Sequence, residues 1–146
     1  MDEFFTFDPL TAGSKGLVFI GDNVLIYRRD DKTTNHPNEL DLPGGGPEEN
    51  ETPFETFKRE VKEEFSINLT QKDIEYVRKY PSTLEQGKFA YFPVAKIPAE
   101  MASRIKLGDE GLEFLLMSLS DYIARDDAWS LFQERAADYA KSHRKE

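Results

Sequence analysis

The sequence contains no cysteine, and it has no apolar run near the ~18 residues that a membrane span needs. The first absence excludes a disulfide framework and a thiol nucleophile. The second argues against a secretory signal or a membrane anchor, so we expect a cytoplasmic protein without membrane contact. The sequence also lacks a linker rich in proline and serine, an internal repeat and a low-complexity run, which predicts one domain spanning residues 1–146.

Basic residues are scarce. The chain has 19 lysines and arginines against 28 aspartates and glutamates, for a net charge of −9. A protein that holds nucleic acid polymers through their phosphates needs a basic patch, so this composition argues against that class of partner. An anionic small molecule can still bind if a divalent cation, or a few lysines and arginines near the site, offset the acidity.

Residues 45–67 read GGPEENETPFETFKREVKEEFSI and predict a helix directly after a glycine-rich turn. Thr52 is a good N-cap, Pro53 suits the first helical position, and Glu55 completes a capping box. The helix should therefore begin at residue 53 and end near Phe65. Ser66 then follows at a position where positive φ commonly ends a helix.

The predicted helix presents Glu60, Glu63 and Glu64 on one narrow arc, beside an apolar arc that should pack against the core. Three carboxylates so close together repel one another and stay ionised most easily around a hard divalent cation. Oxygen-only ligands suit Mg²⁺, and Mn²⁺ is also possible. A solvated acidic helix is the plain alternative, but it explains neither the triple glycine nor Arg59.

This segment resembles the Nudix box, the motif of hydrolases that cut nucleoside diphosphates linked to another group. The box reads Gly-x5-Glu-x7-Arg-Glu-U-x-Glu-Glu-x-Gly-U, in which U is aliphatic. Every specified position but one matches: Gly45, Glu51, Arg59, Glu60, Val61, Glu63, Glu64 and Ile67. The departure is Ser66, which stands where the family has glycine.

The resemblance implies roles for further residues. The Gly44 carbonyl joins Glu60, Glu63 and Glu64 as a metal ligand, and Gly45 approaches the substrate. Glu51 and Arg59 form a structural pair that joins the loop to the helix. Arg28 and Arg29 end a predicted strand where related enzymes often hold phosphate, although only one of two successive strand residues can face the pocket.

The family also keeps an acidic loop that carries a further catalytic or metal-binding glutamate. Residues 109–113 read DEGLE and resemble that loop. Glu110 is the first candidate for the role and Glu113 the second, while an ordinary polar strand entry is the alternative. Either Glu60 or Glu110 would then take the proton from the attacking water.

The remaining elements fit an α/β fold. Strands are expected at residues 15–20, 24–29, 74–80, 88–97 and 112–119, with Pro93 indicating an edge position or a bulge in the fourth. Residues 127–143 carry apolar side chains at helical spacing and predict a covering helix. With the helix at 53–65, this order fits the Nudix-type α/β/α sandwich around a central mixed β-sheet.

The sequence therefore predicts a Mg²⁺-dependent hydrolase that cleaves a phosphoanhydride in a nucleoside diphosphate linked to another moiety and releases a monophosphate. Nucleoside triphosphates and nucleotide sugars of the ADP-ribose type are equally compatible substrates. A non-catalytic Nudix-fold module that binds nucleotides for regulation is the alternative. Such modules tend to lose the box glutamates, all of which are present here. A homodimer is possible, since many relatives dimerise.

Overall fold

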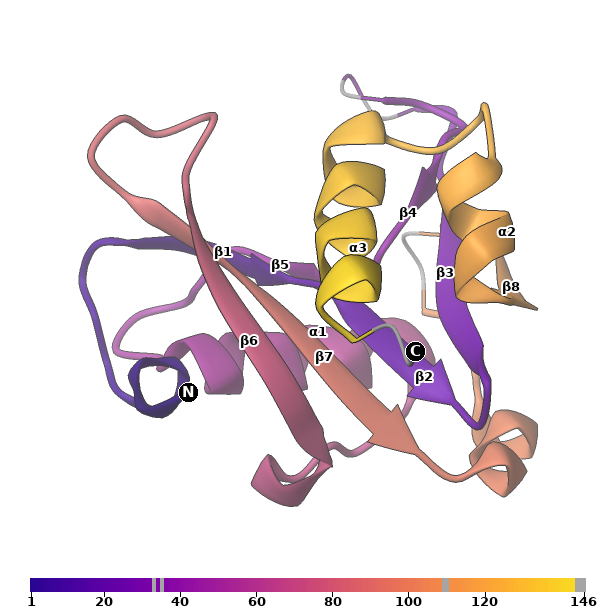
Figure 1. Ribbon diagram of the computed structural model, residues 1–146, viewed down its shortest axis with the longest axis horizontal. Coiled ribbons are helices and arrows are strands. Elements are labelled where there is room, and N and C mark those ends of the chain that lie inside the picture. Colours follow the sequence, from indigo (N-terminus) through magenta and orange to yellow (C-terminus); the bar gives the residue numbers. More distant parts are fainter. Residues whose placement is uncertain (33, 35, 109–110, 144–146) are drawn as a thin grey trace.

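A computed structural model describes residues 1–32, 34, 36–108 and 111–143 of the chain (Figure 1). Its strands are β1 (Thr11–Lys15), β2 (Leu17–Ile20), β3 (Asn23–Arg29), β4 (Leu40–Asp41), β5 (Gly44–Gly45), β6 (Ile74–Pro81), β7 (Phe89–Ile97) and β8 (Gly111–Met117). Its helices are α1 (Pro53–Phe65), α2 (Leu119–Ala124) and α3 (Ser130–Ser142). Three short 3₁₀ turns are η1 (Asp2–Phe5), η2 (Gln71–Asp73) and η3 (Ala99–Arg104).

The strands form one mixed sheet, as the sequence predicts. Strand β7 runs parallel to β1 and β2 along one edge and antiparallel to β6 along the other. Strand β3 pairs antiparallel with β2, β4 and β8. The tight turn between β2 and β3 contains Gly21 at φ 63°, a conformation that glycine adopts without steric cost.

Helix α1 covers one face of this sheet, while α2 and α3 cover the other (Figure 1). Strand β2 shows how the alternation of side chains builds both cores. Val18 and Ile20 pack with Phe57 and Val61 on the α1 side, whereas Leu17 and Phe19 pack on the α3 side. This three-layer arrangement is the predicted α/β/α sandwich.

Pro93 does not lie on an edge strand, so that part of the prediction is wrong. Strand β7 is inside the sheet, and Pro93 faces Gly16, which separates β1 from β2. A Cβ on Gly16 would lie 2.0 Å from the Pro93 carbonyl oxygen. The Gly16 N–H donates to the Pro43 carbonyl instead (3.1 Å). Proline is tolerated here because the neighbouring ladder is interrupted opposite it.

The end of the last strand and the start of the last helix also differ from expectation. The last strand ends at Met117, and Ser118 then caps α2 by accepting a hydrogen bond from the Asp121 N–H (3.1 Å). Helix α3 begins at Ser130 rather than at residue 127. The preceding residues are extended and pair with Leu40, whose N–H donates to the Asp127 carbonyl (2.8 Å) and whose carbonyl accepts from the Trp129 N–H (3.2 Å).

Helix α1 has the predicted ends. The Thr52 hydroxyl accepts from the Glu55 N–H (3.0 Å), and the Glu55 carboxylate accepts from the Thr52 N–H (2.8 Å). Phe57, Val61 and Phe65 are fully buried, and each contributes roughly 1.5–3 kcal/mol through burial. Ser66 ends the helix in the left-handed region at φ 63° and ψ 31°.

We expect Ser66→Gly to leave kcat within about two-fold and to leave the free energy of unfolding unchanged or raise it by up to about 1 kcal/mol. Glycine relieves the strain of positive φ, but its unfolded chain has more freedom to lose. Asn68→Gly is the control, because Asn68 does not have positive φ and should only be destabilised. Urea unfolding measures both, and a loss well above 1 kcal/mol in Ser66→Gly would contradict the expectation.

Candidate active site

Glu60, Glu63 and Glu64 of α1 differ sharply in exposure although they share one side of the helix. Glu64 is buried at 8% exposure, Glu60 is partly buried, and the side chain of Glu63 is 58% exposed. Glu64 therefore lies deepest, against strand β5, and Glu63 lies at the rim. The helix thus carries its carboxylates from the interior of the molecule to the solvent.

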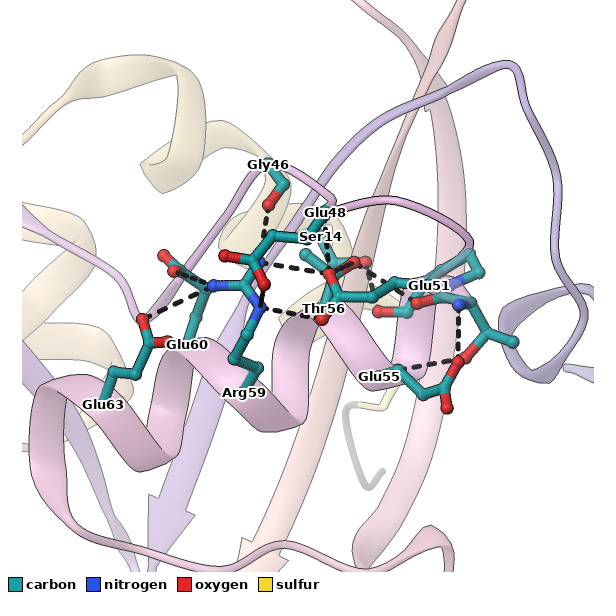
Figure 2. Close-up of polar contacts among 11 residues, drawn as sticks. Ser14, Gly46, Glu48, Glu51, Glu55, Thr56, Arg59, Glu60 and Glu63 are labelled. Atoms are coloured by element: carbon teal, nitrogen blue, oxygen red, sulfur yellow. Dashed lines mark hydrogen bonds and ion pairs between the residues drawn. The ribbon is translucent and has the colours of Figure 1, made fainter.

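Arg59 links the glycine-rich loop to α1 (Figure 2). Its guanidinium donates to the Gly46 carbonyl (2.9 Å) and to both carboxylate oxygens of Glu51 (2.7 and 3.1 Å). It also contacts Glu60 (2.8 Å) and Glu63 (3.4 Å). Although burial acts to raise the pKa of Glu51, the hydrogen bonds from Arg59 and its neighbours hold that pKa below its ordinary value. The lowered pKa favours the ionised form of Glu51, which anchors Arg59.

Strand β5 lies close to both β1 and α1, so its two glycines have little room for side chains. Gly44 has φ 137°, and a Cβ there would lie 2.2 Å from the Ser14 carbonyl oxygen. A Cβ on Gly45 would lie 2.1 Å from Oε2 of Glu60. The Gly44 N–H donates to Oε1 of Glu64 (3.2 Å). The glycines thus bring backbone groups directly onto the carboxylates of the helix.

Burial raises the pKa of Glu64 to about 8, and this is the largest effect on that group. The positive charge of Lys15 and the Gly44 N–H act in the opposite direction. A carboxylate kept from solvent with so little compensating charge is poised to gain a cation or a proton.

The donor atoms suit a hard divalent cation, but their present directions do not converge. Within the described ranges, no three acidic or histidine side chains are grouped closely enough to hold a metal ion. Glu60 and Glu63 turn toward Arg59 instead (Figure 2). Carboxylates on one helical arc next to the Gly44–Gly45 cradle nevertheless fit Mg²⁺ or Mn²⁺, provided that Glu63 rotates away from Arg59.

The acidic loop can be described only in part. Glu110 lies outside the described residues. Glu113 is in β8 and accepts a hydrogen bond from Nε of Arg28 (3.0 Å). Arg28 also contacts the carboxylate of Asp127 (3.3 Å) and donates to the Asn38 carbonyl (2.8 Å). Arg28 thus takes part in a polar network that joins β3, β8 and the segment that precedes α3.

Arg29 belongs to a buried cluster that sequence reasoning missed. Asp41 is fully buried and pairs with Lys15 (2.6 Å) and Arg29 (2.8 Å). Its carboxylate also accepts from the Tyr27 hydroxyl (3.2 Å) and from the Leu42 N–H (2.8 Å). A signal for it is present, since Asp41 is an isolated charge between two leucines. The positive charge of Lys15 also acts to lower the pKa of Glu64, so this cluster influences the electrostatics of the glutamates.

A pocket of about 220 Å³ opens beside the glycines. Its lining includes Gly45 and Gly46, together with Trp129, Phe132 and Arg135 from the region of α3. Residues 82–85, which follow β6, line a further part of its wall. Neither Arg28 nor Arg29 lines it, whereas Lys15 and Arg135 do. Arg135 could have been noticed in the sequence as a charged residue among the apolar positions of α3.

Of the aromatic residues that could stack on a base, Tyr27 and Phe92 are core residues, and Tyr80 lies against Arg78 and Arg135. Tyr91 borders the pocket but is almost fully buried. The accessible ring is instead Trp129, which is half-buried and stacks on His36 with a centroid separation of 4.0 Å. Sequence reasoning did not single out this tryptophan.

Comparison with known proteins agrees with the fold. A family model described as NUDIX domain matches residues 12–135, and the chain belongs to this family. It is accordingly a pyrophosphohydrolase of the Nudix class, whose substrates are nucleoside diphosphate derivatives. A search of curated proteins finds no match.

Solved structures share the fold at low identity. A MutT protein from Methanosarcina mazei Go1 is 21% identical, with a TM-score of 0.73, and the match covers 96% of this chain and all of that one. A bifunctional NMN adenylyltransferase/ADP ribose pyrophosphatase from Francisella tularensis, complexed with AMP and Mn ion, is 23% identical, with a TM-score of 0.70. That match covers 93% of this chain and 42% of that one. The E. coli dihydroneopterin triphosphate pyrophosphohydrolase is 18% identical, with a TM-score of 0.65 and coverage of 94% and 99%.

No helix in the described part of the chain combines the length and the apolar character needed to cross a bilayer.

We expect Gly45→Ala to lower kcat/KM at least about ten-fold with little change in stability. The added methyl group would occupy the position of the Glu60 carboxylate, which can swing away without disturbing the core. Gly46→Ala is the matched control and should lose much less, because a Cβ there would lie 3.7 Å from the nearest atom. Steady-state kinetics and thermal unfolding of both variants measure this. Equal losses in the two variants would contradict the expected position of Glu60.

Glu64→Gln should stabilise the metal-free protein, and increasingly so as pH rises from about 5 to about 8. The folded-state pKa of Glu64 lies above its ordinary value, so the wild type loses stability as pH rises through this window. Glutamine stays neutral and keeps the hydrogen bond from the Gly44 N–H. The difference should reach a few kcal/mol at most.

Thermal unfolding in EDTA, measured at intervals between pH 5 and 9, tests this expectation. The stabilisation by Glu64→Gln should level off above about pH 8, where the wild-type carboxylate is already ionised in both states. A difference between variant and wild type that is independent of pH would show that Glu64 is not desolvated as described.

Proposed function

We propose that this protein is a Mg²⁺-dependent hydrolase that cleaves the phosphoanhydride of a nucleoside diphosphate linked to another group, such as a nucleoside triphosphate or a sugar of the ADP-ribose type. The product is a monophosphate. The observation that carries the proposal is the buried Glu64, pressed against the Gly44 N–H on the helix face that also bears Glu60 and Glu63. Family membership and the Mn ion and AMP bound by the Francisella protein support it.

The proposed metal ligands are Glu60, Glu63, Glu64 and the Gly44 carbonyl, with Glu110 as a further candidate. When bound, the cation polarises the phosphoanhydride and lowers the pKa of an attacking water. Arg59 keeps the loop against α1, so the Gly44–Gly45 backbone stays within reach of the phosphates. A carboxylate, Glu60 or Glu110, accepts the proton of the water.

The lining of the pocket suggests an orientation for the substrate. Gly45 lies against Glu60, so we assign the part of the pocket lined by Gly45 and Gly46 to the diphosphate. The group attached to the diphosphate then extends toward Trp129 and Phe132, whose rings suit a flat or apolar surface. We assign Arg28 and Arg29 to the support of this wall through their pairs with Asp127 and Asp41.

We expect Mg²⁺-dependent release of a monophosphate in a screen of nucleoside triphosphates, ADP-ribose, diadenosine polyphosphates and nucleotide sugars. Glu63→Gln and Glu64→Gln should each lower kcat by at least about a hundred-fold, because each removes a charge that positions the cation. Glu49→Gln, an exposed change in the preceding loop, should stay within about two-fold. In ¹⁸O water, the label should enter a phosphate of the product.

Near-wild-type turnover of both Glu63→Gln and Glu64→Gln at saturating Mg²⁺ would remove these residues from the site. Tight nucleotide binding without turnover of any substrate would instead favour the regulatory module.

A further inference from the structure

Arg135 is a buried arginine on the core-facing side of α3. The residue is only 5% exposed, and Phe132, Ala136 and Tyr139 on the same helix are buried as well. The guanidinium carbon is 4.5 Å from the ring centroid of Tyr80 and 5.3 Å from that of Phe132. Two aromatic faces therefore hold the guanidinium, and they limit the orientations that it can adopt.

No hydrogen bond or ion pair to Arg135 occurs among the residues that the structure describes. Its acidic neighbours on the helix are engaged or distant. Asp138 accepts from the Tyr80 hydroxyl (2.9 Å) and contacts Arg78 (3.7 Å). Glu134 is exposed and acts on Arg135 only through space. Buried arginines are normally paired, because a lone buried charge costs several kcal/mol.

The place where Arg135 can find a partner is the pocket, whose wall it forms together with Trp129. The other cation on that wall, Lys15, is already paired with Asp41. The one acidic residue among those lining the pocket is Glu85, which contacts Lys88 (3.3 Å). Among the lining residues, Arg135 is thus the cation whose charge is available to a ligand.

We propose that Arg135 forms a subsite for an oxyanion of the substrate, a phosphate or a carboxylate, separate from the diphosphate at the glutamates. A planar guanidinium fixed between two rings offers parallel N–H donors that match two oxygens of such a group. The assignment of this group to the substrate rests on the function proposed above. The subsite selects nucleoside diphosphate derivatives that carry an additional negative group over those that carry a neutral sugar.

The chain contains a single tryptophan, and it lines the same pocket. Trp129 fluorescence therefore reports on the subsite without any turnover. Inorganic phosphate and acetate are titrated in EDTA at an ionic strength held constant with KCl. We expect a saturable response to at least one of them, and the stronger of the two identifies the type of oxyanion. No saturable response to either would overturn the proposal.

Arg135→Met should weaken this binding at least about ten-fold, and Arg135→Lys, which keeps the charge but loses the planar fork, should weaken it less. Arg78→Met is the matched control. It removes an exposed guanidinium 4.9 Å from the same Tyr80 ring but outside the pocket wall, and it should bind as the wild type does. Unchanged binding in Arg135→Met, or equal weakening in Arg78→Met, would contradict the proposal.

Folding of the variants is checked in the same samples. Methionine replaces a lone buried charge with an apolar chain of similar length, so Arg135→Met should unfold at the wild-type temperature or higher. The preferred anion should raise the unfolding temperature of the wild type and not that of Arg135→Met. If Arg135→Met does not fold, Arg135→Lys decides the question, and wild-type affinity in that variant overturns the proposal.

Kinetics separate this inference from the proposed activity. Arg135→Met should lower kcat/KM at least about ten-fold for a nucleoside triphosphate and less than about three-fold for a nucleoside diphosphate linked to glucose. An equal loss for both substrates would overturn the inference while leaving the hydrolase intact. Absence of all turnover would instead contradict the proposed function, and the metal-free titration would still test the subsite.

Discussion

The attachment of the glycine-rich loop to α1 through Arg59 is the interaction on which the site depends. One guanidinium holds the Gly46 carbonyl, the Glu51 carboxylate and two of the helix glutamates. It holds the loop that follows β5 against the helix, where a Cβ on Gly45 would meet the Glu60 carboxylate, whereas one on Gly44 would meet β1. The same guanidinium also occupies carboxylate oxygens that a divalent cation would use. Under the proposed metal assignment, cation binding and loop anchoring would be coupled, because Glu63 would have to leave Arg59 to bind the metal.

The site also concentrates charge where solvent is excluded. Glu64 and Asp41 are buried acids, and Arg135 is a buried base. Asp41 is compensated by Lys15 and Arg29, whereas Glu64 and Arg135 form no ion pair among the described residues. An apolar side chain at either position would serve folding better. Arg135 lines the pocket, whereas Glu64 accepts a hydrogen bond from Gly44, which is next to the lining residue Gly45. Under the proposed function, Glu64 would face a cation and Arg135 an anion.

The sequence predicted those features that depend on local rules. The capping box of Thr52 and Glu55, the burial of Phe57 and Val61, and the left-handed Ser66 all follow from spacing along one helix. The mixed sheet followed from the resemblance to a family. Sequence reasoning failed where distant segments meet. It could not see that Pro93 lies opposite the break at Gly16, or that residues 127–129 pair with Leu40 and delay the start of α3.

The pocket was missed for the same reason, because Gly45, Leu84 and Trp129 come from segments far apart in the chain. In the proposed function, the residues that act on the diphosphate belong to the box motif and lie within a single stretch of sequence. The remainder of the substrate would contact side chains that the motif does not contain. Arg135 lies on α3, and Trp129 directly precedes this helix. The apolar pattern of this segment predicted only a helix that packs against the core. Under the proposed function, specificity can therefore change through α3 and residues 82–85 while the glutamates on α1 stay the same.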